Sequence, residues 1–150
     1  MKRLLTIAAT LMIGIVTVTF TGCGSSSTIA VYPNTMTATI KGVLAFSASG
    51  SNINVSKTNG TLNISATATS KSKITITIPS YAATLGTFAI NDIGLPVGAS
   101  YDSLGNGTLL LASTGTITFI TVSPYLQGTF SFVCSDSTKI TSGAFKTKAP

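Results

Sequence analysis

The chain has 150 residues, a formal net charge of +6 and hydrophobic residues at 44% of its positions, and it contains neither histidine nor glutamate. These absences exclude a Ser-His-Asp triad, a paired-glutamate glycosidase site and any histidine metal site. After residue 22 the positive charge comes from seven dispersed lysines without any arginine, a pattern that does not indicate nucleic-acid binding.

Residues 1–22 have the organisation of a secretion signal. Met1–Arg3 is positively charged, Leu4–Phe20 is apolar, and Thr21 and Gly22 are small residues before Cys23. This ending resembles the bacterial lipobox, in which the cysteine is lipidated and becomes the first residue of the mature protein. An uncleaved transmembrane anchor is the alternative, because the apolar run approaches the spanning length of about 20 residues.

The lipobox resemblance implies several acyl chains on Cys23, which is enough for stable anchoring without a membrane span. We therefore expect a lipidated Cys23 with a flexible tether over residues 23–34, followed by a β domain over residues 35–150. Gly24 stands where an aspartate would favour retention in the inner membrane. The expected location is the bacterial cell envelope, at the outer membrane, with the side that the protein faces left open.

From residue 35 onward, apolar and polar residues alternate in short runs, which predicts β-strands separated by turns. The strongest alternation is Lys73–Ile78, which places three isoleucines on one face before Pro79. Asn59-Gly60 is the strongest hairpin signal. Other strands expected before residue 107 are Thr35–Ile40, Val43–Ala48, Ile53–Lys57, a run with Leu62, Ile64, Ala66 and Ala68 on its inner face, Thr87–Asn91 and Tyr101–Ser103.

Two stretches fit no regular strand. Tyr81–Leu85 is predicted to be a helical turn or a loop, and Asp92–Ser100 is predicted to be a long loop that suits contact with a partner. In the last third, strands are expected over Thr108–Ser113, on both sides of Ser123-Pro124-Tyr125, and over Lys139–Lys148 with an interruption at Ser142-Gly143. Adjacent large residues at Phe119-Ile120 indicate either a β-bulge or a strand buried on both faces.

A five-residue pattern recurs in the chain: glycine, threonine, an apolar residue, any residue, and a second apolar residue. It is interpreted as the start of a strand, because glycine suits a turn and threonine favours a strand. Its five copies are Gly60–Ile64, Gly86–Ile90, Gly107–Leu111, Gly115–Phe119 and Gly128–Phe132. About ten short strands and no ordinary helix predict an all-β fold, either a single antiparallel β-sandwich or a small filled β-barrel.

The signal, the lipobox and these strand motifs together resemble a family of small uncharacterised Bacteroidota lipoproteins. The motifs that carry the resemblance are Met36–Gly42, Asn59–Ile64, Gly86–Ile90, Gly115–Phe119, Gly128–Phe132 and Ser142–Phe145. The resemblance implies a β-rich domain of the cell envelope and supplies no catalytic residues.

Few residues are candidates for chemistry. Asp92, Asp102 and Asp136 would suggest an enzyme only if they converged in one cleft, and Asp102–Asn106 is interpreted as a turn. Cys134 would be the only thiol left after lipidation, and it is expected to fill space beside Phe130 and Phe132 rather than to act in redox chemistry.

Two sets of surface residues have both a structural and a binding interpretation. Lys146 and Lys148 are expected to guard an edge strand against aggregation, with an anionic partner as the alternative. Four tyrosines near strand ends are expected to cap the core with wet hydroxyls, with sugar stacking as the alternative: Tyr32, Tyr81, Tyr101 and Tyr125.

The sequence thus predicts a noncatalytic, membrane-anchored envelope lipoprotein that interacts with a protein or a glycan, without a cofactor or a metal. A β-barrel carrier for a small apolar ligand is the alternative, and it requires an enclosed cavity.

Overall fold

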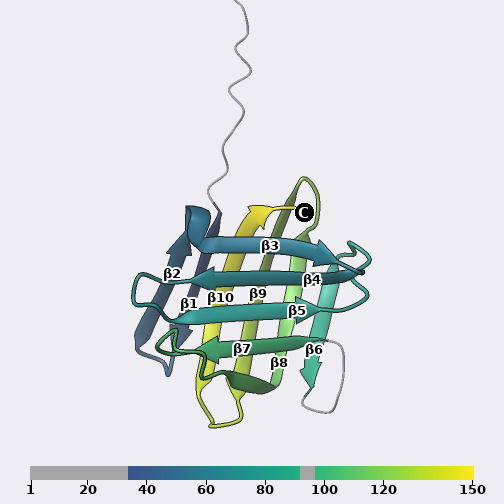
Figure 1. Cartoon of the computed structure of the whole chain (residues 1–150). Helices are drawn as coiled ribbons and strands as arrows, with labels where there is room; N and C mark the ends of the chain where they lie inside the picture. The colour runs from purple at the N-terminus through teal and green to yellow at the C-terminus, as the bar shows by residue number, and fades with distance from the viewer. Residues whose placement is uncertain (1–33, 92–96) are drawn as a thin grey trace, which may run out of the picture. The chain divides into compact units, whose positions relative to one another are not determined.

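The computed structural model describes residues 34–91 and 97–150, which form an all-β structure (Figure 1). The all-β prediction is confirmed, and the described residues form ten strands and one short 3-10 turn, η1, at Gly50–Asn52. The strands are β1 Thr35–Ile40, β2 Leu44–Ser49, β3 Ile53–Thr58, β4 Thr61–Thr67, β5 Lys73–Ile78, β6 Gly86–Asn91, β7 Gly98–Asp102, β8 Leu110–Thr121, β9 Tyr125–Cys134 and β10 Lys139–Lys148.

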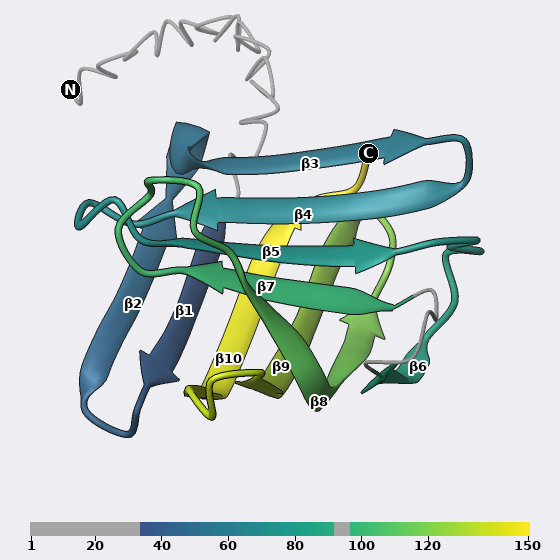
Figure 2. The same cartoon turned by 60° about the horizontal axis from the view of Figure 1, so that its bottom comes forward.

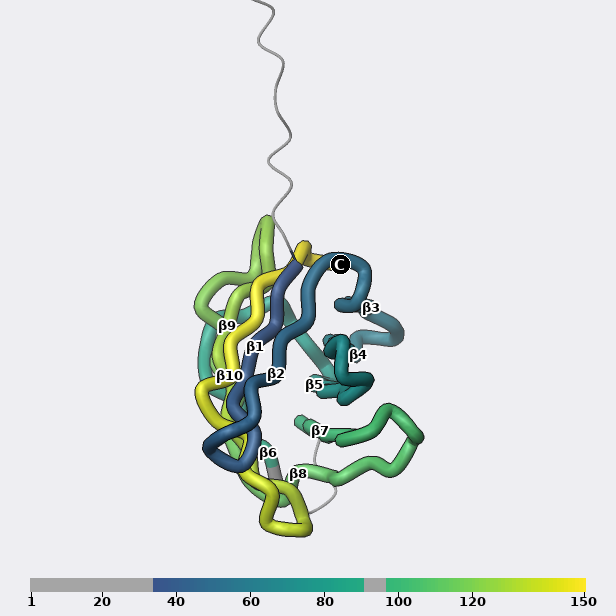
Figure 3. Tube along the Cα trace, turned by 90° about the vertical axis from the view of Figure 1, so that its left-hand side faces the viewer, coloured from purple at the N-terminus to yellow at the C-terminus, as the bar shows by residue number. Residues whose placement is uncertain are grey.

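All strand pairs are antiparallel and form one path in the order β2-β1-β10-β9-β8-β7-β5-β4-β3, with β6 paired to β8 beside it. Strands β3, β4, β5 and β7 cross over the strands of the other layer, and the two layers are seen edge-on in Figure 3. The fold thus combines the two predicted alternatives, because one nearly closed, barrel-like sheet folds over itself as a sandwich does.

Strand β8 joins the two layers. Leu110 and Leu111 pair with β7, whereas the later part of β8, from Thr114, pairs with β6 and β9. A register shift between Ala112 and Thr114 marks a bulge, and bulges bend a strand and increase its twist. Figure 2 shows the resulting bend in β8. The separate strand predicted at Thr108–Ser113 is therefore wrong, since it belongs to one long bent strand.

The prediction that every Gly-Thr pair starts a strand is also wrong. Gly60 and Gly86 precede or begin β4 and β6, but Gly115 and Gly128 lie inside β8 and β9. A Cβ atom on Gly128 would lie 2.3 Å from the carbonyl oxygen of Thr118. The interior glycines are therefore required by close packing. The remaining copy of the motif begins at Gly107, a few residues before β8.

The core lies between the two layers and is filled with aliphatic and aromatic side chains. The inward residues of β4 and β5 that the alternation predicted are buried: Leu62, Ile64, Ala66, Ala68, Ile74, Ile76 and Ile78. Phe119 contacts the ring of Phe145 at a centroid distance of 5.6 Å, and Phe130 stacks on Phe132 at 6.1 Å. Cys134 is 1% exposed on the same face as Phe130 and Phe132, as predicted.

The predicted turns and irregularities are largely confirmed. Asn59 and Gly60 have φ values of +50° and +77°, the conformation that a two-residue hairpin favours. Register shifts occur after Phe119 and between Ile140 and Gly143, as the broken alternation indicated. Tyr81–Leu85 lies in neither a helix nor a strand, so the loop interpretation is correct.

Strand β7 begins earlier than predicted. Residues 98–100, expected in the loop Asp92–Ser100, pair with β5 through Gly98, Ala99 and Ser100. Residues 92–96 of that loop lie outside the described residues. The alternation around Ala99 was hidden by the glycine and proline residues before it, which predict a loop.

Candidate functional site

The predicted lipidation site, Cys23, lies outside the described residues, as do Tyr32 and Asp92. The remaining two aspartates are each held in a loop by local hydrogen bonds, and they line two different pockets.

Asp102 organises the loop between β7 and β8. Its carboxylate accepts backbone N–H bonds from Leu104 at 3.0 Å, Gly105 at 2.8 Å and Gly107 at 2.8 Å. Burial raises the pKa of Asp102, but these backbone donors together outweigh burial and lower its pKa below the ordinary value. A carboxylate whose oxygens accept these bonds stabilises the loop rather than taking part in acid–base chemistry. This agrees with the turn that was predicted at Asp102–Asn106.

Asp136 plays the same part in the turn between β9 and β10. Its carboxylate accepts the backbone N–H and the hydroxyl of Thr138, each at 2.8 Å. These two bonds lower the pKa of Asp136, and the positive charge of Lys41 contributes in the same direction.

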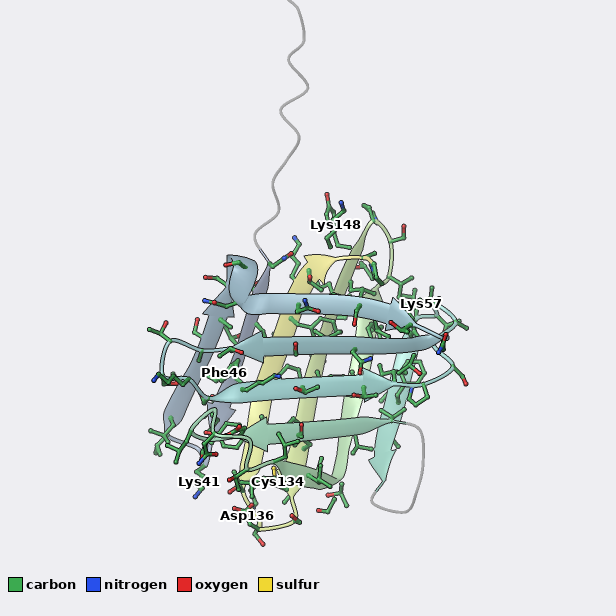
Figure 4. The ribbon with its side chains drawn as sticks, viewed as in Figure 1. Lys41, Phe46, Lys57, Cys134, Asp136 and Lys148 are labelled. Carbon is green, nitrogen blue, oxygen red and sulfur yellow. The ribbon has the colours of Figure 1, made fainter. Side chains whose placement is uncertain are left out.

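A pocket of about 410 Å³ lies between the β1–β2 turn and the β9–β10 turn. We call it the turn pocket, and it is lined by Lys41, Gly42, Asp136, Ser137, Thr138, Lys139 and Thr141. The backbone N–H of Lys41 donates to the carbonyl of Lys139 at 2.8 Å, which fixes the two turns side by side. Figure 4 shows Lys41 and Asp136 near one another at one end of the sheet, with Lys148 at the opposite end.

The backbone of the turn pocket is shaped by positive φ angles. Lys41 has φ +52°, Gly42 has φ +77° and Ser137 has φ +67°. The left-handed conformation is uncommon for lysine and serine and is maintained here by the paired strands on both sides. The pocket therefore has a defined shape and presents ammonium and hydroxyl donors, which suit the binding of an anion.

A second pocket, of about 510 Å³, lies between the β4–β5 turn and the β7–β8 loop. We call it the loop pocket, and it is lined by Thr67, Lys71, Lys73, Asp102, Gly105, Gly107 and Leu109. A Cβ atom on Gly105 would lie 2.3 Å from the carbonyl oxygen of Lys71, so the two loops touch at this glycine. Like the turn pocket, it combines two lysines with one hydrogen-bonded aspartate.

A third hollow, of about 140 Å³, lies over β8, β9 and β10 beside Gly115 and Ser131. All three of these pockets open to solvent. None of them is the enclosed apolar cavity that the carrier alternative requires.

Cys134 is buried, and its thiol has a raised pKa of about 11, first because of burial and then because of the Asp136 charge. A high pKa keeps the sulfur protonated at neutral pH, and it is the thiolate that reacts. These properties agree with the space-filling interpretation of this residue.

The predicted edge role of Lys146 and Lys148 is wrong. Their strand, β10, pairs with β1 on one side and β9 on the other, so it is an interior strand. The Nζ atom of Lys146 lies 5.8 Å from the centroid of the Tyr125 ring. The last strand of the sequence became interior because the first strand pairs with it.

The predicted wet hydroxyl is wrong for Tyr81, which is 5% exposed and whose hydroxyl is buried without a hydrogen-bond partner. Tyr101 is equally buried, and Tyr125 is half-buried. The Tyr81 ring packs on Phe119 at a centroid distance of 5.3 Å. The rings of Tyr81 and Tyr101 are therefore part of the core rather than a platform for sugar stacking.

Sequence reasoning missed both lysine pockets. The available signals were the lysines beside glycines and aspartates in predicted turns, such as Lys41-Gly42, but alternation says nothing about which turns meet.

No grouping of three His, Cys, Asp or Glu side chains that could hold a metal occurs within residues 34–91 and 97–150. In the same ranges, no helix is long and apolar enough to cross a membrane.

Comparisons with known proteins were made by family models, by sequence and by structure. No family model, no curated protein and no solved structure matches this chain. The resemblance to Bacteroidota lipoproteins stays a prediction, and the function is argued from the geometry of the site.

Proposed function

We propose that this protein is a noncatalytic lipoprotein of the bacterial cell envelope, anchored through Cys23, that binds a protein or a glycan through the end of the domain formed by the turn pocket. The observation that carries the proposal is the placement of the pocket relative to the point where the chain joins the sheet.

The chain joins the domain at Asn34, beside the end of β10. The side-chain oxygen of Asn34 accepts the backbone N–H of Lys148 at 3.2 Å and the hydroxyl of Thr147 at 3.3 Å. Strand β1 runs away from this point over six residues, which corresponds to about 20 Å at 3.3 Å per residue. The turn pocket lies at the far end of β1 from Asn34.

The chemistry of the described residues supports binding rather than catalysis. Both described aspartates are occupied by loop hydrogen bonds, and the thiol of Cys134 is buried. The carrier alternative has less support, because the pockets open to solvent and the core positions are filled.

The anchoring part of the proposal is tested in the native cells by feeding an alkyne-tagged fatty acid and recovering the protein. We expect the tag on the wild-type protein and on Cys134→Ser, and none on Cys23→Ala, which should leave the membrane fraction if the signal is still cleaved. Tag-free wild-type protein would contradict the proposal.

The interaction part is tested by protease treatment of intact and lysed cells, followed by photo-crosslinking at the exposed Ser137. Cleavage of the protein on intact cells would direct the search to external ligands, and protection would direct it to periplasmic ones. A crosslinked partner recovered from Ser137 but not from Lys57, which lies outside the turn pocket, is the expected result. Equal recovery from both positions, or none, would contradict the assignment of this end as the binding surface.

A further inference from the structure

We propose that the turn pocket binds an oxyanion, a carboxylate or phosphate group carried by a polar ligand such as an acidic sugar. This inference rests on the proposed function, because it names the ligand class of the same site. It is carried by two lysines, one in the β1–β2 turn and one at the start of β10, that line one pocket with a single carboxylate.

Lys41 and Lys139 continue the pairing of β1 with β10. The register matches Thr39 with Thr141 and Ile40 with Ile140, and the next step is the hydrogen bond from the Lys41 N–H to the Lys139 carbonyl. Both lysines are exposed. Both side chains line the turn pocket, so an anion bound there would meet two ammonium groups.

The acid beside these lysines compensates for only part of their charge. Asp136 is the one carboxylate that lines the turn pocket, against two ammonium groups. Its two oxygens are engaged by the N–H and the hydroxyl of Thr138. The pocket therefore retains a positive charge that a bound oxyanion would neutralise.

The loop pocket has the same number of lysines and aspartates but fewer hydroxyl groups. Its lining includes one hydroxyl side chain, Thr67, against Ser137, Thr138 and Thr141 in the turn pocket. Leu109 adds an exposed apolar side chain instead. The turn pocket is consequently the better candidate for the anion, and the loop-pocket lysines serve as a matched control.

The size and lining of the turn pocket set the ligand class. A volume of about 410 Å³ falls within the range of small-molecule sites. Ser137 and Thr141 add exposed hydroxyl groups beside the lysines, and no aromatic ring is among the lining residues. A small, hydroxylated, negatively charged ligand matches donors of this kind, since oxyanions form strong charge-assisted hydrogen bonds with lysine.

The test uses the full mature lipidated protein in nanodiscs of neutral phosphatidylcholine, so that anionic headgroups do not compete. Saturation-transfer NMR detects binding of glucuronic acid, glucose 6-phosphate and neutral glucose. We expect a signal for at least one charged sugar and an affinity at least tenfold lower for glucose. Competition by inorganic phosphate, and the ranking of the two charged sugars, distinguish a phosphate site from a carboxylate site.

The double variant Lys41→Gln/Lys139→Gln should weaken binding at least tenfold, whereas Lys71→Gln/Lys73→Gln, which removes the same charge at the loop pocket, should change it less than twofold. Circular dichroism checks that both variants fold. Equal binding of glucose, no binding of either charged sugar, or equal loss in both variants would overturn the proposal. Fatty-acid tagging of Cys23 and crosslinking from Ser137 are separate readouts, so the proposed function can fail or stand independently of this result.

Discussion

The backbone N–H of Lys41 lies 2.8 Å from the carbonyl oxygen of Lys139, so two lysines from two distant turns share one end of the β1–β10 pair. Lys41 lies in the β1–β2 turn with φ +52°, Lys139 begins β10, and both side chains line the turn pocket. This relationship has consequences for stability as well as for binding.

Replacing Lys139 by glutamine should stabilise the protein without any ligand. Removing one of two like charges that line the same pocket lowers their repulsion, and it is expected to raise the free energy of unfolding by about 0.2–1 kcal/mol at low ionic strength. The gain should shrink in 1 M NaCl, because salt screens exposed charges. Urea unfolding at both salt concentrations measures the effect, with Lys57→Gln as the control; an equal gain in that control would refute the explanation.

Because of the hydrogen-bonded aspartates, the stability of the folded protein should decrease as the pH is lowered. Because the folded-state pKa values of Asp102 and Asp136 lie below the ordinary 3.8, their stabilisation is complete above about pH 3.8 and is lost as the pH falls through the lower folded-state values. Melting temperatures measured from pH 6 to pH 2 should fall less steeply in Asp102→Asn and least in the double variant Asp102→Asn/Asp136→Asn. Parallel curves for all three proteins would contradict this assignment.

Tyr81→Phe should stabilise the protein or leave its stability unchanged. The hydroxyl of Tyr81 is buried without a hydrogen-bond partner, and such a group costs about 1–3 kcal/mol. The ring contact with Phe119 is retained in phenylalanine. Denaturant unfolding should show a gain of about 1 kcal/mol, compared with no gain for Tyr125→Phe, which is half-buried. A clear loss of stability would show that the hydroxyl has a partner.

Gly128→Ala should be strongly destabilising, because the added methyl would lie 2.3 Å from the Thr118 carbonyl oxygen and 2.6 Å from the Phe145 ring. Forcing an extra carbon into a packed site typically costs 1–3 kcal/mol, and we expect about 3 kcal/mol here. Gly98→Ala is the matched control, since no atom lies within 4 Å of its added Cβ. Thermal and urea unfolding of both variants measure the difference, and comparable losses would contradict the packing argument.

The thiol of Cys134 should resist alkylation in the folded protein. With a folded-state pKa of about 11 it remains protonated at pH 8, whereas unfolding in urea restores a pKa near 9.0 and access to reagent. The stability contributed by the protonated thiol is present below pH 9 and is lost as the pH rises through about 11. Mass spectrometry after iodoacetamide treatment, with and without urea, should show a large rate difference; rapid native labelling would exclude a buried thiol.

Much of the local structure follows from the sequence. The strict alternation of Lys73–Ile78 fixed which side chains face the core, and Asn59-Gly60 located a hairpin because few residue pairs adopt two positive φ angles easily. The burial of Cys134 with the phenylalanines of β9 also followed from a period of two. The chemical exclusions followed from composition alone, since a missing residue type cannot contribute to any site.

Other features depended on contacts between distant parts of the chain. Local glycine patterns predicted strand starts at Gly115 and Gly128, yet those glycines are there because a neighbouring strand leaves no room for a side chain. Likewise, the sequence suggests two separate strands here, whereas the structure has a single strand, β8, that bends at the bulge between Ala112 and Thr114.

The sequence by itself determined the all-β class, the inward faces and most of the turns, because these depend on side-chain period and on backbone preferences of neighbouring residues. Only the tertiary structure decided that the last strand lies beside the first, joining residues as far apart as Asn34 and Thr147, which are 113 positions apart. That pairing brings Lys41 and Lys139 together at the turn pocket. Alternation has the same period in every strand, so it specifies which side of a strand faces inward but not which strand becomes its neighbour.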